Sequence, residues 1–522
     1  MKTIAKNAND FQSIRTMDKG NCIYVDKTDY FHRLVTAPNE NLFFIARPRR
    51  FGKSLMITTF KYIFEGRREL FKGLKIDRTD YDWKVHPVIH FDFSQCARET
   101  YAAFMSEMPE VVKSAICESG YAYDDKKTPA INFLNAVAWH YAQGNPCVVL
   151  IDEYDDPVAR ALANPAEAEL IRSELAGIYG KIKGKTHMIR FLMITGVSKF
   201  TKMSVFSALS NLTDLTFDAA YAAMLGYTEE ELDEYFAEHM AAHAKVMGLD
   251  DAAYRAELER WYNGYRFSPD NPVTVYNPVS TGLTFASPSG EFRGTWTETG
   301  RPSMLMNFIR REGLLAIDYE NGVTVRKNDF DVSDIRNLPA VGMLYQTGYL
   351  TIKDYEDGDY TLGIPDEEVR RDLLLLVAAQ AAEADERWVG DTVRYLRRCE
   401  FEDFFAGLRS LFAHLPYGSK EGRVHEMSYE RALKILFWSQ GLETVCEDTQ
   451  SAGRADIVVK YRKAIYVFEL KRDGSADEAL AQIREKGYAT PYLADGRPVW
   501  AIGLAFDTKT RQLVDAKEER FA

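Results

Sequence analysis

Cysteine is scarce in this sequence, and no two cysteines stand close together. The six cysteines of the 522 residues are scattered, and none forms a C-x-x-C pair. Closely spaced cysteines build disulfide frameworks and many zinc sites, so the sequence argues against both kinds of scaffold. We therefore expect reduced thiols and a cytoplasmic protein.

Long hydrophobic runs are also missing. No apolar run approaches the roughly 18 to 20 residues that a membrane span needs. Residues 1–10 contain no apolar stretch of the kind that forms a secretory signal. We expect no membrane partner and no secretory leader.

Positive charge is not in excess. The chain has 65 Lys and Arg residues against 77 Asp and Glu residues, which gives a net charge of −12. This balance argues against a surface coated for nonspecific nucleic-acid binding, but it leaves a local basic groove open. A metal-dependent nuclease can also be acidic, because the metal offsets carboxylate charge at the site.

The sequence does have ample apolar residues, at 46%, and its length predicts two to four domains. The first 220 residues alternate short apolar runs with amphipathic segments such as 54–64 and 165–179. Four runs read as buried strands: 41–46, 87–93, 147–151 and 189–194. Such alternation predicts a parallel α/β sheet of the P-loop NTPase type.

The pattern changes twice further along the chain. From Thr228, which opens a helix with the capping-box sequence TEEE, to about residue 412 the chain is mainly helical. The segment 341–353 ends in a strand, which with 360–364 would form a hairpin around 356–358, the wing of a small winged-helix-like unit. We predict three domains: a P-loop domain at 1–225, a helical lid with this unit at 226–415, and a third domain at 416–522.

The third domain has its own order of elements. It reads helix, three strands, helix and strand, at 427–441, 444–449, 455–461, 464–470, 476–487 and 499–505. This order predicts a restriction-endonuclease-like α/β core.

A candidate phosphate loop follows the first strand directly. Backbone N–H groups at a helix N-terminus bind phosphate oxygens, Lys53 would reach the β- and γ-phosphates of ATP, and Ser54 would bind Mg²⁺. The other residues expected around the nucleotide are Arg49, Arg50, Phe51 and Gly52. The full Walker A pattern has glycine where this chain has Arg47, and the alternative interpretation is a basic surface turn.

Two acidic residues end the strand at 147–151. Asp152 is expected in the Mg²⁺ shell, as in a Walker B motif, and Glu153 would orient or deprotonate the attacking water. About 100 residues after a G-K-S sequence in an α/β region, this pair favours an ATPase over a strand that merely meets solvent. Thr195 and Ser198, after the next strand, are candidates for sensing the γ-phosphate.

Asp456, Glu469 and Lys471 form a second candidate site in the third domain. In a hairpin Asp456 can approach Glu469, and two carboxylates can hold Mg²⁺, with Mn²⁺ as an alternative. Lys471 lies on the same strand face as Glu469, where it can stabilise charge during phosphodiester hydrolysis. The D-x(12)-E-x-K pattern is common by chance, and a solvated edge hairpin is the alternative.

Residues of about 5 to 285 resemble the AAA-ATPase-like domain of a large bacterial family. The stretches that carry the resemblance are YVDKT at 24–28, RPRRFGKSL at 47–55, IDEYDDP at 151–157, TGVSKF at 195–200, WYNGYRF at 261–267 and YNPVS at 276–280. The family characteristically has arginine at the position of Arg47. The resemblance makes Arg266 a candidate for contacting the γ-phosphate from a neighbouring lobe or subunit, with a structural ion pair as the alternative.

Residues of about 415 to 522 resemble the PD-(D/E)XK nuclease domain that follows the ATPase-like domain in that family. The matching stretches are GRADI at 453–457, FELK at 468–471 and ALAQIREKGY at 479–488, with MLYQTGYLTI at 343–352 and LGIPDEEV at 362–369 in the region between. The resemblance implies that Asp456 and Glu469 bind metal and that Lys471 is catalytic. It implies accessory roles for Glu426 and Gln482.

The resulting interpretation is an ATP-binding, ATP-hydrolysing switch coupled to a nuclease-like domain that acts on DNA or RNA, with homo-oligomerisation left open. One alternative is a nucleic-acid or protein binding module with an inactive nuclease fold. Another is a scaffold ATPase in which the nucleotide controls oligomerisation. A third is a protein that binds ATP and barely hydrolyses it, in which Glu153→Gln would make little difference.

Overall fold

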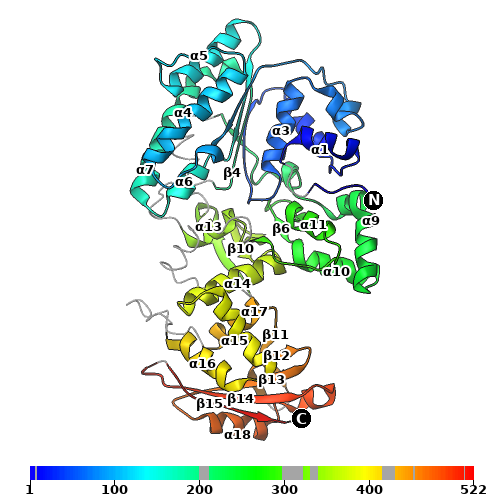
Figure 1. Cartoon of the computed structure of the whole chain (residues 1–522), viewed down its shortest axis with the longest axis vertical. Helices are drawn as coiled ribbons and strands as arrows, with labels where there is room; N and C mark the ends of the chain where they lie inside the picture. The colour runs from blue at the N-terminus through cyan, green and yellow to red at the C-terminus, as the bar shows by residue number, and fades with distance from the viewer. Residues whose placement is uncertain are drawn as a thin grey trace. The chain divides into compact units, whose positions relative to one another are not determined.

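The computed structural model describes residues 1–5, 9–198, 211–296, 321–329, 339–413, 429–450, 453–510 and 512–521, with backbone alone at 446–450 and 453–454. The chain forms two compact units. Unit 1 contains Met1–Asn307 and Asp318–Glu367, and unit 2 contains Phe308–Ile317 and Glu368–Ala522. Figure 1 labels the helices and strands of both units.

Unit 1 is built on a parallel five-stranded sheet in the order β2-β3-β4-β1-β5. Its strands are β1 Leu42–Ala46, β2 Val88–Asp92, β3 Cys147–Asp152, β4 Ile189–Gly196 and β5 Thr213–Asp214. The apolar runs form strands because a parallel sheet covered on both faces buries nearly every side chain. Since β4 lies between β1 and β3, the ends of these three strands adjoin one another.

Helices cover both faces of this sheet (Figure 1). One face packs on α4 Tyr101–Glu118, α5 Pro129–Ala142 and α7 Pro165–Tyr179, and α6 Asp156–Ala161 follows β3 closely. On the other face, α3 Lys53–Phe64 places Phe60 and Phe64 against Phe191 of β4, with ring centroids 5.1 and 5.0 Å apart. The preceding short helices are α1 Phe11–Thr16 and α2 Thr28–Val35.

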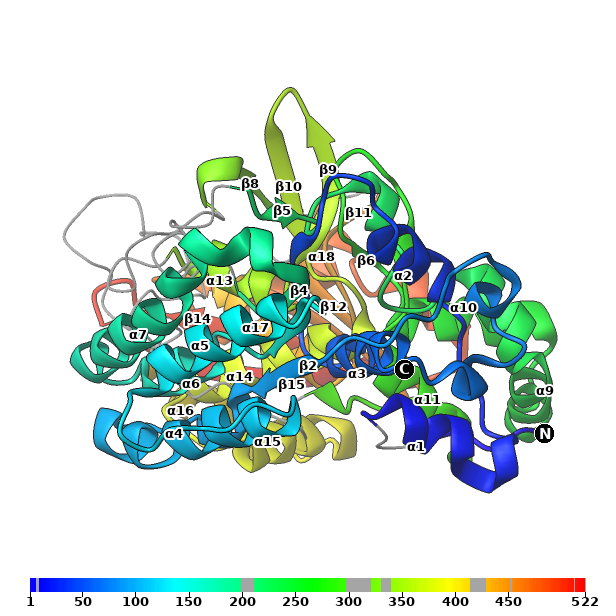
Figure 2. The ribbon, with the colours of Figure 1, turned by 90° about the horizontal axis from the view of Figure 1, so that it is seen from above.

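A second apolar cluster of unit 1 is helical. It contains residues of α9 Glu229–Met247, α10 Asp251–Tyr262 and α11 Pro278–Phe285. Thr228 caps α9 through the predicted capping box with Glu231. The predicted hairpin is also present, as β9 Thr351–Glu356 and β10 Asp359–Gly363, and it extends as a ribbon in Figure 2. Unit 1 also contains α13 Ala340–Gln346, β6 Tyr265–Arg266, β7 Thr274–Val275 and β8 Val323–Arg326.

Unit 2 is a mixed sheet in the order β11-β12-β13-β14-β15, in which only β13 and β14 pair in parallel. The strands are β11 Glu443–Gln450, β12 Gly453–Tyr461, β13 Ala464–Arg472, β14 Val499–Phe506 and β15 Leu513–Arg520. Helix α18 Ala476–Lys486 packs on one face through Leu480 and Ile483. On the other face, Phe404 of α16 Phe401–Ala413 and Phe437 of α17 Tyr429–Ser439 contact Phe468. Helices α14 Glu367–Ala381 and α15 Glu386–Arg398 precede them.

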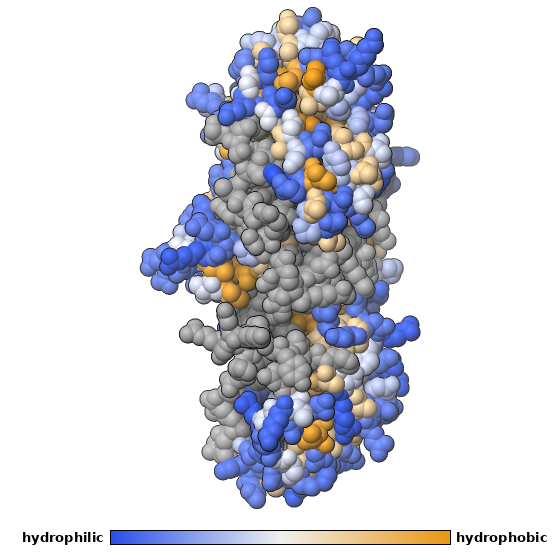
Figure 3. All heavy atoms as spheres, turned by 90° about the vertical axis from the view of Figure 1, so that its left-hand side faces the viewer, coloured by the Kyte–Doolittle hydropathy of each residue, from blue (hydrophilic) through white to orange (hydrophobic). Residues whose placement is uncertain are grey.

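The predicted α/β fold class is confirmed, with a parallel sheet near the N-terminus, a helical middle region and a C-terminal mixed sheet. Among the described residues, no helix has the length and hydrophobicity needed to span a membrane. Among the coloured residues of the face drawn in Figure 3, hydrophobic side chains form small patches separated by hydrophilic ones. The three predicted domain boundaries remain a prediction.

Candidate phosphate and metal sites

The loop between β1 and α3 presents backbone N–H groups at the start of a helix. Gly52 is the N-cap residue of α3, has a φ of 87° and offers no side-chain cap. The first N–H groups of α3 therefore lack a side-chain acceptor, and such groups at a helix N-terminus attract anions. Ser54 stands in this first turn.

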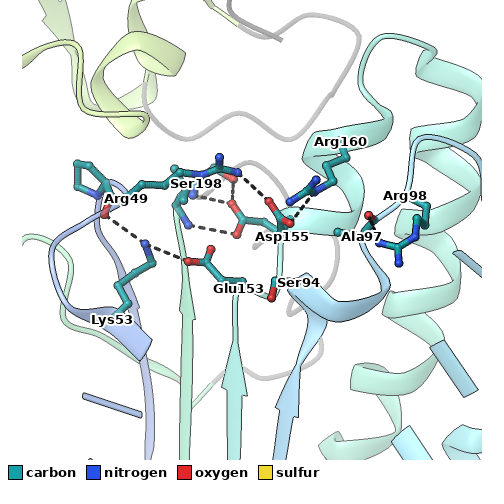
Figure 4. Close-up of polar contacts among 12 residues, drawn as sticks. Arg49, Lys53, Ser94, Ala97, Arg98, Glu153, Asp155, Arg160 and Ser198 are labelled. Carbon is teal, nitrogen blue, oxygen red and sulfur yellow. Dashed lines mark hydrogen bonds and ion pairs between the residues drawn. The ribbon is translucent and has the colours of Figure 1, made fainter. Parts of the chain in front are cut away.

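Lys53 is buried and held in place by the loop that it follows. Its side chain is 3% exposed, and its Nζ donates to the carbonyl oxygens of Arg47 at 3.1 Å and Pro48 at 3.2 Å. Lys53 Nζ also lies 3.4 Å from Glu153 Oε1 (Figure 4). The ammonium group thus joins the end of β1 to the end of β3.

Asp152 is the last residue of β3, and the hydroxyl groups of Ser54 and Thr195 lie beside its carboxylate. Its Oδ1 accepts a hydrogen bond from Thr195 Oγ1 at 2.5 Å, and the side chain of Ser54 also donates to its carboxylate. Burial raises the pKa of Asp152, while the hydrogen bonds from Ser54 and Thr195 act in the opposite direction. A carboxylate beside a serine hydroxyl supplies the hard oxygen ligands that Mg²⁺ prefers, so these two side chains fit that ion.

Glu153 follows in a left-handed backbone conformation, with a φ of 49°. Burial raises the pKa of its carboxyl group, and the positive charge of Lys53 partly offsets the effect. Its Oε2 is buried and has no hydrogen-bond partner within the described parts of the chain. A carboxylate oxygen of this kind can accept a proton or a hydrogen bond from a bound water.

Asp155 and Tyr154 hold the end of β4. The carboxylate of Asp155 accepts hydrogen bonds from the backbone N–H groups of Val197 at 3.1 Å and Ser198 at 2.7 Å, and from the Ser198 hydroxyl (Figure 4). Tyr154 OH donates to the Ser198 carbonyl at 2.8 Å. A Cβ on Gly196 would lie 2.4 Å from the Tyr154 ring, so the contact requires glycine.

The pKa of Asp155 is raised to about 6, chiefly because the carboxylate is buried and secondarily because of the nearby charge of Glu153, whereas the hydrogen bonds from Ser198 and Val197 act in the opposite direction. No role for Asp155 is predicted from the sequence. The acidic run DEYDD was the available signal, but it does not reveal which of the acidic residues turns toward β4. Ser198 therefore lies at the site as a partner of Asp155.

Arg49 reaches across to α6. Its Nη2 lies 2.8 Å from Asp156 Oδ1, and Arg160 Nε lies 2.9 Å from Asp156 Oδ2. Asp156 is buried, whereas both arginines are about half exposed. Asp156 would keep Arg160 as a partner if Arg49 turned toward a bound phosphate.

Arg47 points away from the helix N-terminus. Its guanidinium is buried and donates to the carbonyls of Ala46 at 3.0 Å and Thr216 at 2.7 Å, and it stacks 4.2 Å from the Phe267 ring centroid. Burial lowers the pKa of Arg47 to about 10. The arginine in place of the first Walker A glycine thus ties β1 to the segment after β5.

Arg266 also makes local contacts. Its guanidinium donates to the carbonyls of Ser268, Pro269 and Asn271 in its own loop, at 2.6 to 3.2 Å. These bonds account for its placement without an acidic partner, and its predicted contact with the γ-phosphate remains a prediction.

A cavity of about 390 Å³ opens beside the phosphate loop. Its polar wall includes Arg49 to Ser54 and Glu153, and Arg266 is not part of its lining. The rest of its lining is mainly apolar and includes Val25, Phe31 and Leu283. A volume of a few hundred Å³ with an apolar wall and a small set of polar groups is typical of a small-molecule site.

In unit 2 four of the predicted nuclease residues lie together, namely Asp456, Glu469, Lys471 and Gln482. The β12–β13 ladder pairs Ile457 with Phe468, and Asp456 and Glu469 are the next residues on the two strands. Asp456 Oδ2 accepts a hydrogen bond from the Leu470 N–H at 2.7 Å. The pKa of Glu469 is raised to about 7, first by burial and then by the charge of Asp456.

Lys471 connects this carboxylate pair to α18. Its Nζ lies 3.0 Å from Glu469 Oε1 and donates to Gln482 Oε1. Glu469 is 4% exposed and its Oε2 is buried without a hydrogen-bond partner in the described chain, whereas Lys471 is 24% exposed. An unsatisfied buried carboxylate oxygen beside a second carboxylate fits a divalent cation.

Two family models match this chain. Residues 8–206 match the family described as Predicted AAA-ATPase, and residues 424–516 match the PD-(D/E)XK nuclease superfamily. The chain is 33% identical over 507 residues to an Azotobacter chroococcum mcd 1 protein described as "Uncharacterized protein in vnfD 5'region", and the match covers 94% of each chain.

The chain belongs to this AAA-ATPase-like and PD-(D/E)XK nuclease family. No solved structure matches it. Domains of these two types generally use ATP and divalent metals.

One residue that the family resemblance singled out, Glu426, lies outside the described residues. No group of three or more His, Cys, Asp and Glu side chains that could hold a metal occurs in the described portion of the chain. Within the described residues, two side chains at each site could hold a metal, with water or phosphate oxygens completing the shell, which is common for Mg²⁺.

Proposed function

We propose that this protein is an ATP-hydrolysing switch coupled to a metal-dependent nuclease that cuts DNA or RNA. The observation that carries the proposal is that one chain contains two separate sites suited to phosphate chemistry. One combines Lys53, Asp152 and Glu153 with a helix N-terminus. The other combines Asp456 and Glu469 with Lys471.

In the ATP site, the phosphates would accept hydrogen bonds from the N–H groups of α3 and draw Lys53 Nζ from the carbonyls of Arg47 and Pro48. That movement would release Glu153 from Lys53 and leave its carboxylate to orient and deprotonate a water. Asp152 and Ser54 would hold Mg²⁺, whose positive charge offsets the phosphate charge that develops during transfer.

In the nuclease site, Asp456 and Glu469 would hold the divalent cation, which supplies Lewis acidity and an activated water. Lys471 would place its positive charge beside the developing phosphorane and stabilise it. Gln482 and Glu469 fix the ammonium group of Lys471 from two sides. Gln482 is therefore a positioning residue in this account.

The nuclease proposal is tested with labelled single- and double-stranded DNA and RNA in Mg²⁺ or Mn²⁺. The variants are Lys471→Ala and Glu469→Gln, and Lys126→Ala on the exposed surface of unit 1 is the control. We expect cleavage by the wild type and the control, and a loss of about a hundredfold or more in both site variants. Cleavage that survives in Lys471→Ala and Glu469→Gln would assign the activity to a contaminant and contradict the proposal.

A further inference from the structure

Basic side chains from separate elements of unit 2 gather around Tyr461, at the end of the β12–β13 hairpin away from the carboxylates. Tyr461 ends β12, and Arg462 and Lys463 form the turn into β13. Tyr461 stands five residues from Asp456, which corresponds to about 16 Å along a strand. The surface formed by Tyr461, Arg462, Lys463 and Arg397 is called the hairpin-end surface below.

Arg397 comes to this surface from α15. Its Nη2 donates to the carbonyl of Gln440 at 2.6 Å, and its guanidinium lies 5.6 Å from the centroid of the Tyr461 ring. The pKa of Arg397 is lowered by partial burial and by the positive charges of Arg371 and Arg462. Two arginines thus place positive charge near the guanidinium group of Arg397.

The turn residues place more positive charge on the same aromatic ring. Arg462 lies 5.9 Å from the Tyr461 ring centroid, and Arg462 and Lys463 are both exposed. The pKa of Tyr461 is lowered, first by a hydrogen bond from Arg462 and then by the charges of Arg462, Arg397 and Lys463. An aromatic side chain thus lies among three cationic ones.

Acidic side chains neutralise only the flanks of this surface. Lys460 Nζ lies 3.2 Å from Glu443, and Arg497 pairs with Asp495 while donating to the Tyr461 carbonyl at 2.8 Å. Arg397, Arg462 and Lys463 have no ion pair with an acidic side chain of the described chain. Such a local excess is unexpected on a protein whose net charge is −12.

We propose that the hairpin-end surface binds the phosphate backbone of a nucleic acid, with Tyr461 as an aromatic contact. This inference rests on the proposed nuclease function and assigns part of the substrate contact to residues remote from the carboxylates. The planar guanidinium group of arginine can donate two hydrogen bonds to phosphate oxygens. Surfaces that combine basic and aromatic side chains are typical of nucleic-acid binding. An acidic polypeptide would use the charges but has no bases to stack on Tyr461.

The test measures binding of a short fluorescent DNA duplex and a single strand by anisotropy, with full-length protein carrying Lys471→Ala to prevent cleavage. Arg462→Ala/Lys463→Ala is added to this background. The logarithm of the binding constant falls linearly with the logarithm of the salt concentration, and each lost phosphate contact makes this slope less steep by about 0.9 for a duplex. The slope of the double variant should therefore be less steep by roughly 1.8. Raising the salt from about 50 to 200 mM should then weaken duplex binding by the double variant roughly tenfold less than binding by its parent.

The control is Lys126→Ala/Lys509→Ala, which removes the same charge from exposed sites elsewhere. We expect its salt slope to match that of the Lys471→Ala parent. An unchanged slope in Arg462→Ala/Lys463→Ala, or equal competition by poly-glutamate and DNA, would overturn the proposal. If the wild type cut no nucleic acid and binding still depended on Arg462 and Lys463, the nuclease function would be refuted, but the proposed role of the hairpin-end surface in binding would remain.

Discussion

Glu153 and Lys53 face each other across the phosphate site at 3.4 Å, so each is the nearest opposite charge of the other. Replacing Glu153 with Gln removes the ion pair and the proposed base together. We expect Glu153→Gln to bind ATP at least as tightly as the wild type, because Lys53 is released for the phosphates. We expect ATP turnover to fall by about a hundredfold or more.

Binding of a fluorescent ATP analogue and release of phosphate measure the two quantities separately. Lys53→Ala is the contrasting variant, since it should lose binding as well as turnover. Turnover by Glu153→Gln at the wild-type rate would show that Glu153 is not the base.

The buried carboxyl of Asp155 gives a pH-dependent prediction. Its pKa in the fold is raised to about 6 from 3.8, so between about pH 4 and 6 the folded chain holds a proton that the unfolded chain has released. The contribution of Asp155 to the free energy of unfolding must therefore decrease as pH rises through this window. Asp155→Asn cannot titrate and lacks this decrease.

We expect the Tm of Asp155→Asn, relative to wild type, to rise by several degrees between about pH 4 and pH 7. The comparison of two proteins at each pH cancels the titration of groups that they share. Calorimetry on both proteins measures the difference. A constant Tm difference across this range would contradict a raised pKa at Asp155.

Some contacts of single residues could be predicted from the sequence, and others could not. Phosphate transfer needs a cationic side chain and carboxylates, so residues of the types of Lys53, Asp152 and Glu153 could be expected from the sequence. The structure brings these three residues together. The buried contacts of Arg47 and Asp155 depend on the segments after β5 and β4. No local pattern in the sequence specifies such long-range contacts.

At the scale of elements, Gly196 sets how closely the turn after β3 approaches β4. A Cβ at this position would lie 2.4 Å from the Tyr154 ring and 2.5 Å from Asp155 Oδ1. We expect Gly196→Ala to lower the free energy of unfolding by about 1 to 3 kcal/mol through overpacking, and to reduce ATP turnover.

Gly177 in α7 provides the matched control, because its Cβ would meet nothing within 4 Å. Gly177→Ala should stabilise the helix by up to about 1 kcal/mol. Denaturant unfolding of both variants tests the pair. Equal stability of the two variants would mean that the close approach at Gly196 is not maintained in solution.

The buried strands β1 to β4 could be predicted because each contains a short, mainly apolar run, and β12, β13 and β14 could be predicted for the same reason. The edge strand β15, with the sequence LVDAKEER, was not predicted, because an edge strand exposes half of its side chains and reads as a polar segment. The two-residue strand β5 is too short to leave a pattern.

For the nuclease-like site, alternation along β13 sufficed to place Glu469 and Lys471 on one face. The β12–β13 register brought Asp456 beside them, as a tight hairpin requires. The hydrogen bond from Lys471 to Gln482 depends on how α18 packs against the sheet, which periodicity alone does not specify.

At the scale of the whole molecule, the two sites lie in different compact units of one chain. Coupling therefore requires that the nucleotide state of unit 1 alter the activity of unit 2. The contacts within each site would be the same if the nuclease did not respond to ATP and the ATPase did not respond to nucleic acid. Coupling must therefore be measured directly.

The most direct test of the account measures nucleic-acid cleavage with and without ATP, in wild type, Lys53→Ala and Lys471→Ala. The account predicts that cleavage requires Lys471, that ATP changes the wild-type rate, and that Lys53→Ala abolishes the response to ATP while Lys471 remains intact. The same rate with and without ATP, in wild type and Lys53→Ala alike, would contradict the coupling of the two sites.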